Sequence, residues 1–274
     1  PCHGRGRGFK SHLSRFPQPP VENLLVGIMK LITFGCSWTY GVGAAYTNGE
    51  SYKEYRKDSM DYDIISKFAF RTLLANRLDL ENINLSSAGS SNQKQQRKAL
   101  EYFRSDNKDE WKDSIVVWGI TSTTRNEMWI NKENKYRNFL YQIGNTLLQE
   151  NLPFSVEQFV DWFYDRNNEI NRLCYMMDHW NQFFENLGIR NIWFNTFNTY
   201  VYPREVKRLI KRDLLTQMTR PHLRDEHFSV WKEDSKRIRE AKKKKLVNPY
   251  SLHPTKEGHI QIADILEKYI RENL

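Results

Sequence analysis

Short apolar runs that end at small or polar residues divide the chain into strand-sized segments. The run 31–34 is stopped at once by Gly35, and 114–120 is rich in β-branched residues and apolar on both faces. Two further strand-sized segments occupy 83–85 and 189–196. Apolar residues on both faces of a strand are typical of a parallel sheet that helices cover on both sides. These four segments are therefore predicted to be strands of one buried sheet.

Helical spacing of apolar residues separates the predicted strands. A period near 3.6 residues appears over 64–77, 93–103 and 255–274, and aromatic residues recur at helical spacing over 131–188. The alternation of strand, turn and helix predicts an α/β fold, a flavodoxin-like three-layer α/β/α sandwich with a central parallel sheet and a helical insertion over 131–188. The aromatic residues of that insertion are interpreted as core, with a lid or a sugar-stacking surface as the alternative. The polar segment 44–63 is predicted to be a loop.

Length and composition suit a globular protein. A chain of 274 residues with 39% hydrophobic content can bury a sizeable core as one large domain. The segment 1–28 mixes Gly, Arg, Pro and Ser without apolar periodicity, so we expect a disordered or non-native leader followed by a domain over 29–274. The longest apolar stretch, 24–34, is too short to span a bilayer, and no membrane association is expected.

Few cysteines and an uneven charge add two expectations. Three cysteines without metal-like spacing favour a reducing compartment over a disulfide framework. The net charge is +9, and 204–245 alone holds 15 Lys or Arg against 7 Asp or Glu. We interpret 204–245 as a basic helical segment that either contacts a polyanion or is an ordinary solvated face.

Residues that could carry chemistry follow the predicted strands. Ser37 stands two residues after Gly35, and a turn of small residues that ends near Gly89 follows the second strand. Thr121 follows the third strand. Since ligands of parallel sheets bind beyond the carboxyl ends of the strands, we expect these residues to meet at one rim. His253 is followed by Pro254 and then by Thr255, which is suited to cap the last helix. A rigid loop is therefore predicted at His253.

These four blocks, in this order, resemble the SGNH or GDSL hydrolase superfamily. The resemblance covers Met29 to Leu274, apart from the long insertion between Gly119 and His253. It implies the SGNH hydrolase fold, Ser37 as the nucleophile and His253 as the general base. It also implies an oxyanion hole made by the backbone N–H groups of Ser37 and Gly89 and by a side chain of the third block. No metal or organic cofactor is implied.

The third block departs from the family pattern. The family usually has Gly-x-Asn-Asp there, and this chain has Gly-Ile-Thr-Ser from Gly119 onward. Thr121 stands at the asparagine position and could donate through its hydroxyl. Asn126 and Arg125 are the alternatives for the third donor.

The acid of the family pattern is missing too. Tyr250 stands three residues before His253, where the family has an aspartate. The orienting acid is therefore expected among Asp225, Glu226 and Asp234, or a backbone carbonyl replaces it. Cys36 replaces the aspartate of the first block and is interpreted as a small packed residue, and His259 as a packing histidine.

The resemblance predicts a serine esterase that hydrolyses an O-acyl ester, such as an O-acetyl group on a carbohydrate, through an acyl-serine intermediate. Its partner would be a small ester or an acylated carbohydrate, in a cytoplasmic or virion-associated setting. The rival hypothesis is a catalytically silent relative that binds an acidic polymer or a partner protein through 204–245.

Overall fold

The computed structural model describes residues 29–47, 49–58, 61–104, 108–140, 164–196, 200–210, 213–219 and 238–274. A five-stranded sheet in the order β2-β1-β3-β6-β7 forms its centre, and all neighbouring strands are parallel. This is the strand order of flavodoxin-like doubly wound sheets. The strands are β1 (Lys30–Phe34), β2 (Glu81–Asn84), β3 (Ile115–Ile120), β6 (Arg190–Asn195) and β7 (Leu209–Ile210).

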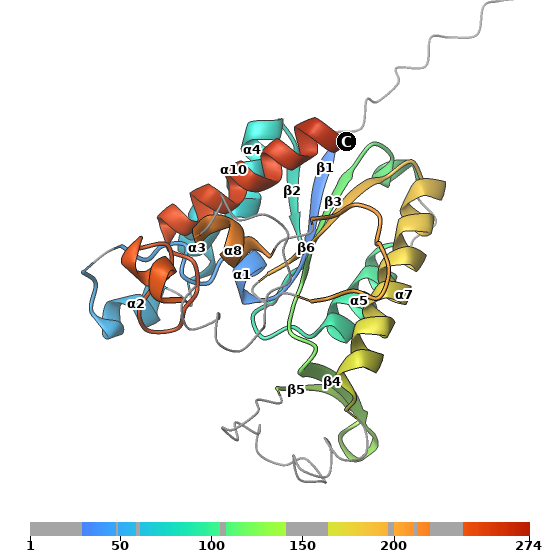
Figure 1. Cartoon of the computed structure of the whole chain (residues 1–274), viewed down its shortest axis with the longest axis horizontal. Coiled ribbons are helices and arrows are strands. Elements are labelled where there is room, and N and C mark those ends of the chain that lie inside the picture. Colours follow the sequence, from blue (N-terminus) through green and yellow to red (C-terminus); the bar gives the residue numbers. More distant parts are fainter. Residues whose placement is uncertain are drawn as a thin grey trace, which may run out of the picture.

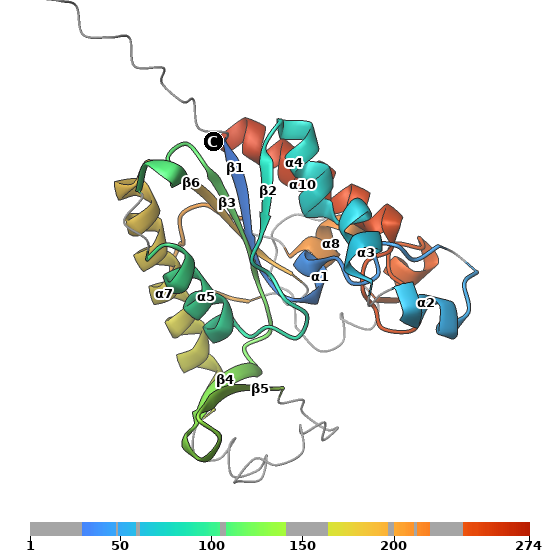
Figure 2. The same cartoon turned by 180° about the vertical axis from the view of Figure 1, so that it is seen from behind.

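Helices cover both faces of the sheet, which confirms the predicted α/β/α sandwich (Figure 1). The same two layers are seen from behind in Figure 2. One layer holds α1 (Ser37–Tyr40), α3 (Tyr62–Phe68), α4 (Phe70–Leu78), α8 (Leu214–Thr219) and α10 (Lys256–Asn273). The other layer holds α5 (Asn92–Tyr102) and α7 (Arg166–Asn186). Within the described residues, no helix has both the length and the apolar character that a bilayer crossing requires.

The central strand β3 is buried along its whole length and contributes to two separate cores. Val117 faces α10 and packs in the cluster that contains Leu266. Trp118 faces the opposite way and packs with Trp180 of α7, whose ring centroid lies 5.5 Å away. Both faces of β3 carry apolar side chains, and a helical layer covers each face, as the continuous apolar run predicts.

The prediction of helix over 131–188 is wrong in its first part. Strands β4 (Arg125–Ile130) and β5 (Lys135–Leu140) form an antiparallel hairpin, joined by the short helix η2 (Asn131–Glu133) and by Asn134 at φ 49°. The rings of Trp129 and Tyr136 meet edge to face across the two strands, with centroids 5.0 Å apart, so cross-strand pairing decides the local structure.

Helix α7 forms the last part of the segment 131–188, which the sequence predicts to be a helical insertion. It is helical as predicted, but it is not an insertion, because it forms a layer of the sandwich on the crossover between β3 and β6. Its residues Trp180 and Phe184 are core, which confirms that interpretation for them, whereas Tyr175 is exposed. Residues 141–163 lie outside the described part.

Two further segments differ from the predictions. The predicted loop 44–63 contains α2 (Tyr52–Asp58) and the capped start of α3 at Asp61. The segment 204–245, predicted to be helical, begins as irregular chain, continues as β7 and then contains α8. The residues that follow Arg208 form a strand because they pair in parallel with β6.

Some of the positive charge of 204–245 is matched by acidic residues of α7. Arg204 pairs with Asp178 and lies over the ring of Tyr175 at 5.1 Å, and Arg208 lies 3.4 Å from Glu185. Residues 242–245 are exposed lysines, while 211–212 and 220–237, like the leader 1–28, lie outside the described part. Contact with a polyanion stays a prediction.

His259 is a packing histidine, as the sequence analysis expects. It is fully buried in α10, its ring stacks on that of Phe70 with centroids 5.9 Å apart, and its Nδ1 accepts a hydrogen bond of 3.2 Å from the Phe70 N–H. That N–H opens α4, where helix geometry leaves it without an intrahelical partner. Burial lowers the pKa of His259 from 6.5 to about 3.

This lowered pKa makes stability depend on pH. Between pH 6.5 and about 3, the unfolded chain binds a proton at His259 that the folded chain does not, so the free energy of unfolding falls as the pH falls. The contribution is about 1.4 kcal/mol for each pH unit in that window. We expect His259→Asn, which keeps an acceptor for the Phe70 N–H but cannot titrate, to flatten this dependence.

Urea unfolding at several pH values between 7 and about 4 measures the slope. The control is His179→Asn, which removes an exposed histidine of α7. Equal slopes for His259→Asn and the unaltered protein would contradict the prediction.

Candidate active site

Ser37 begins the one-turn helix α1 immediately beyond the carboxyl end of β1. The turn is tight: a β-carbon added at Gly35 would lie 2.0 Å from Thr39 Oγ1, so only glycine lets α1 fold back over the strand. Ser37 is 5% exposed. Its hydroxyl is thus held at the rim of the sheet, as expected from the sequence.

The loop that carries His253 packs directly against the chain that follows α1. A β-carbon added at Gly43 would lie 2.6 Å from the Pro254 carbonyl oxygen and 3.0 Å from His253 Cβ. The His253 carbonyl accepts hydrogen bonds of 2.9 Å from both the backbone N–H and the side-chain amide of Asn248. Thr255 accepts a bond of 3.2 Å from the Gly258 N–H and caps α10, as predicted.

The structure brings the two residues of the predicted catalytic pair together. His253 Nε2 and Ser37 Oγ lie 2.7 Å apart, although the residues are separated by 216 positions in the chain. A neutral imidazole with an unprotonated Nε2 can accept the serine proton at this distance.

The electrostatic surroundings keep His253 neutral. Burial, and after it the nearby positive charge of Arg125, lowers the pKa of His253 from 6.5 to about 4. The imidazole is therefore uncharged at neutral pH and free to accept a proton.

The other ring nitrogen of His253 contacts a hydroxyl. Nδ1 lies 2.7 Å from Ser251 Oγ, which also hydrogen bonds to the phenol of Tyr55 and to Asn248 Oδ1, the latter at 3.1 Å. Among the described residues, no Asp or Glu side chain hydrogen bonds to His253. The candidate acids Asp225, Glu226 and Asp234 lie outside the described part.

The sequence analysis missed Ser251, Asn248 and Tyr55. A signal existed for Ser251 and Asn248, which are polar residues within five positions of His253. No local signal indicates Tyr55, because it belongs to a segment predicted to be a loop and meets Ser251 across 196 positions.

The loops that follow β2 and β3 are linked to the serine turn. The Ser87 N–H donates to the Gly35 carbonyl at 3.2 Å, which places the turn containing Gly89 on the same rim as Ser37. The Asn92 side chain accepts from the Thr121 N–H at 3.0 Å and donates to the Thr121 carbonyl at 3.1 Å. Chain beyond three neighbouring strands thus surrounds the serine.

The two candidates for a third oxyanion donor, Thr121 and Asn126, differ in their hydrogen bonding. The hydroxyl of Thr121 is buried and has no hydrogen-bond partner within the described part of the chain. The amide of Asn126 accepts from Gln93 Nε2 at 3.0 Å and donates to the Thr123 carbonyl at 3.4 Å. Asn126 is thereby engaged in local structure.

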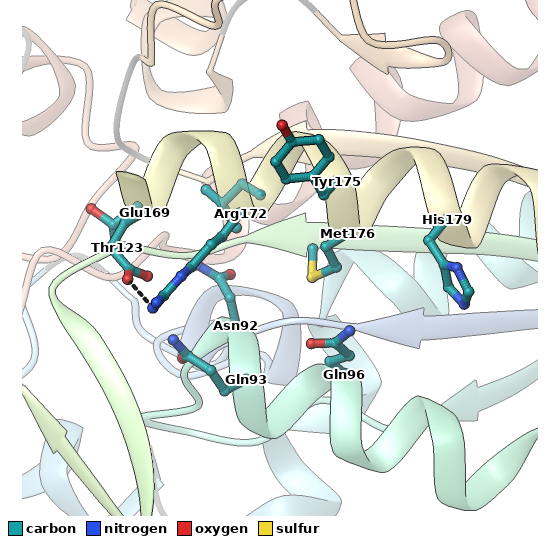
Figure 3. A pocket seen from close by; sticks show the side chains of 10 residues that line it. Asn92, Gln93, Gln96, Thr123, Glu169, Arg172, Tyr175, Met176 and His179 are labelled. Atoms are coloured by element: carbon teal, nitrogen blue, oxygen red, sulfur yellow. Dashed lines mark hydrogen bonds and ion pairs between the residues drawn. The ribbon is translucent and has the colours of Figure 1, made fainter. Parts of the chain in front are cut away.

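A pocket of about 480 Å³ lies between α5 and α7 (Figure 3), and neither Ser37 nor His253 is among its lining residues. Figure 3 shows the carboxamides of Gln93 and Gln96 reaching from α5 toward α7, that of Gln93 near the end of the Arg172 side chain and that of Gln96 below Met176. Asn92 and Thr123 line one end of the pocket, and Glu169 and Arg172 form an ion pair in its wall. The full set of lining residues is Asn92, Gln93, Gln96, Thr123, Glu169, Arg172, Leu173, Tyr175, Met176 and His179. The Glu169 carboxylate is buried, which raises its pKa, and it bonds Arg172 at 2.6 Å.

The remaining candidate groups have structural roles. Cys36 is fully buried in the core, as interpreted from the sequence, and it forms no disulfide. Across the described residues, no three His, Cys, Asp or Glu side chains are grouped as metal ligands.

Comparisons with known proteins find similarity among solved structures. No protein-family model and no curated protein sequence matches the chain. A similar solved structure is that of a carbohydrate esterase, whose active site is described as displaying divergent catalytic and non-catalytic binding functions. The match covers 89% of this chain and 69% of that one, at 15% sequence identity and a TM-score of 0.44.

Proposed function

We propose that this protein is a serine hydrolase that cleaves an O-acyl ester through an acyl-serine intermediate. The observation that carries the proposal is the distance of 2.7 Å between Ser37 Oγ and His253 Nε2 at the carboxyl rim of a parallel sheet. A serine is unreactive until an adjacent base removes its proton, and the neutral imidazole is such a base.

The reaction follows from these two side chains. Ser37 Oγ attacks the ester carbonyl carbon while its proton passes to His253 Nε2, which forms a tetrahedral intermediate and an imidazolium. The imidazolium protonates the leaving alcohol as the ester C–O bond breaks, and the acyl group remains on Ser37. Water then attacks the acyl carbon, gives its proton to Nε2, and the collapse of the second intermediate releases the carboxylic acid and restores the serine hydroxyl.

The negative oxygen of both intermediates needs hydrogen-bond donors. We assign this role to the backbone N–H groups of Ser37 and Gly89 and to the hydroxyl of Thr121. Thr121 is preferred to Asn126 because its buried hydroxyl has no partner among the described residues, whereas the Asn126 amide is already bonded. Arg125 contributes positive charge near His253, which favours the oxyanion and opposes the imidazolium. Loss of one donor costs roughly 10²–10³ in rate.

An acylated carbohydrate is the substrate class that the pocket favours. Carboxamides such as those of Gln93 and Gln96 both donate to and accept from sugar hydroxyls, and Tyr175 and His179 offer ring surfaces beside them. Asn92 and Thr123 line one end of the pocket, and in this proposal the alcohol half of the ester extends from Ser37 past them between α5 and α7. An O-acetyl group is the small acyl group to test first.

Replacement of the nucleophile tests the proposal. We expect the unaltered protein to hydrolyse p-nitrophenyl acetate and Ser37→Ala to lose at least about 10³-fold in kcat/KM, because the alanine has no hydroxyl to acylate. The control is Ser66→Ala, whose serine hydroxyl bonds only the Asp63 carbonyl on α3. Equal background rates for the unaltered protein and Ser37→Ala would contradict the proposal and favour the silent binding protein.

The pH profile tests the role of His253. Because its pKa is lowered to about 4, the base stays unprotonated and kcat/KM stays level from neutral pH down to about pH 5, then falls as the imidazole takes up a proton. We expect Arg125→Gln to move the inflection to higher pH, since it removes a positive charge that disfavours the imidazolium. Circular dichroism at each pH separates loss of activity from unfolding. An inflection near 6.5 in the unaltered protein would contradict the lowered pKa of His253.

A further inference from the structure

We propose that the hydroxyl of Ser251, held by Tyr55 and Asn248, is the positioning group that orients His253 in place of a carboxylate. The inference rests on the proposed function and concerns how the base of that reaction is set. It starts from the contact of 2.7 Å between Ser251 Oγ and His253 Nδ1, on the side of the ring opposite to Ser37.

The direction of each hydrogen bond follows from counting protons. The backbone N–H groups of Tyr250 and Ser251 point at one atom of the Asn248 amide, at 3.1 and 2.8 Å. An N–H can only donate, so that atom is the carbonyl oxygen Oδ1. The Ser251 hydroxyl lies 3.1 Å from the same oxygen, which has no proton to give, and we therefore assign its single proton to the bond with Asn248.

With its proton committed to Asn248, the Ser251 oxygen can only accept from its other neighbours. It accepts from the phenol of Tyr55 and from Nδ1 of His253. Nδ1 must therefore carry the proton of the neutral ring, which leaves Nε2 unprotonated and directed at Ser37. This is the tautomer that general-base catalysis needs.

Aromatic packing holds the phenol of Tyr55 in place. Tyr55 is 6% exposed, and its ring packs against Tyr46 and Tyr250 at centroid distances of 5.8 and 5.7 Å. Tyr250 itself stands where the family has its acid, and its hydroxyl donates to the Glu50 carbonyl at 2.8 Å. Tyr250, at the position where the family has its acid, thus helps to hold the segment that carries Tyr55.

The short link between Ser251 and His253 is also constrained. Leu252 has φ 61°, a left-handed conformation that is strained for a non-glycine residue. Its side chain packs against the core cluster, and its N–H bonds the Asn248 carbonyl at 3.3 Å. Such strain persists only where the surroundings hold the loop in one conformation, so Ser251 has little freedom to leave the ring.

The Ser251 hydroxyl is a neutral acceptor, so it can orient the His253 ring without stabilising the imidazolium form of that ring. The titratable or charged groups that face His253 are Arg125 of β4, His259 of α10 and, through Ser251, Tyr55 of α2. No carboxylate is among these groups of the described chain, which agrees with the lowered pKa of His253. A carboxylate placed at residue 251 should reverse that effect.

Three variants and a matched control test the inference by kinetics. We expect Ser251→Ala to lower kcat by roughly 10- to 100-fold with little change in KM, because part of the general-base contribution depends on ring orientation. Tyr55→Phe should give a smaller loss, and Ser251→Asp should move the inflection of the pH profile to higher pH. The control is Tyr52→Phe, which removes a hydroxyl from the exposed face of the same helix.

Nitrogen NMR of the histidine ring gives a readout that does not require turnover. We expect the Nδ1–H tautomer of His253 in the unaltered protein, a mixture of tautomers in Ser251→Ala, and a raised His253 pKa in Ser251→Asp. Unchanged kcat and an unchanged tautomer in Ser251→Ala would overturn the inference, and so would an unmoved His253 pKa in Ser251→Asp. Either result leaves the proposed function standing if Ser37→Ala is inactive. If the unaltered protein shows no esterase activity, the NMR results alone decide the role of Ser251.

Discussion

Parallel pairing of β1 with both β2 and β3 is the constraint on which the site depends. Parallel strands end on the same side, so the chain that leaves each of them must turn at one shared rim. Residues that are far apart in sequence are thereby placed next to Ser37. The apolar residues on both faces of β3 stabilise this arrangement, since they bind a helical layer to each side of the sheet.

The histidine reaches this rim by a different route. It does not follow a strand of the sheet, but lies on a loop whose backbone packs against Gly43. Two hydrogen bonds to the His253 carbonyl and the helix cap at Thr255 hold that loop from both ends. The short contact between imidazole and serine hydroxyl is therefore a consequence of backbone packing and does not depend on attraction between the two side chains.

Within the described residues, no carboxylate bonds to His253, and this bears on its proposed role as a base. An aspartate beside the imidazole both orients the ring and stabilises its positive charge, whereas a network of hydroxyl and amide groups only orients it. Burial and the charge of Arg125 push in the same direction, toward a neutral ring. In the proposed reaction, the same positive charge would favour an oxyanion and oppose the imidazolium that forms with it.

The sequence by itself determined four of the five strands of the central sheet and its parallel type, and it singled out Ser37 and His253, whose catalytic roles are the proposal made above. Their signals are local: apolar runs such as 114–120, a glycine that ends a strand before Ser37, and a proline that fixes the residue after His253. Only the tertiary structure decided the hairpin at 125–140, the place of α7 as a layer of the sandwich, and the partner of His253 Nδ1. These features depend on contacts between distant segments, such as Tyr55 with Ser251, and local propensity carries no information about which distant group will fill a given space.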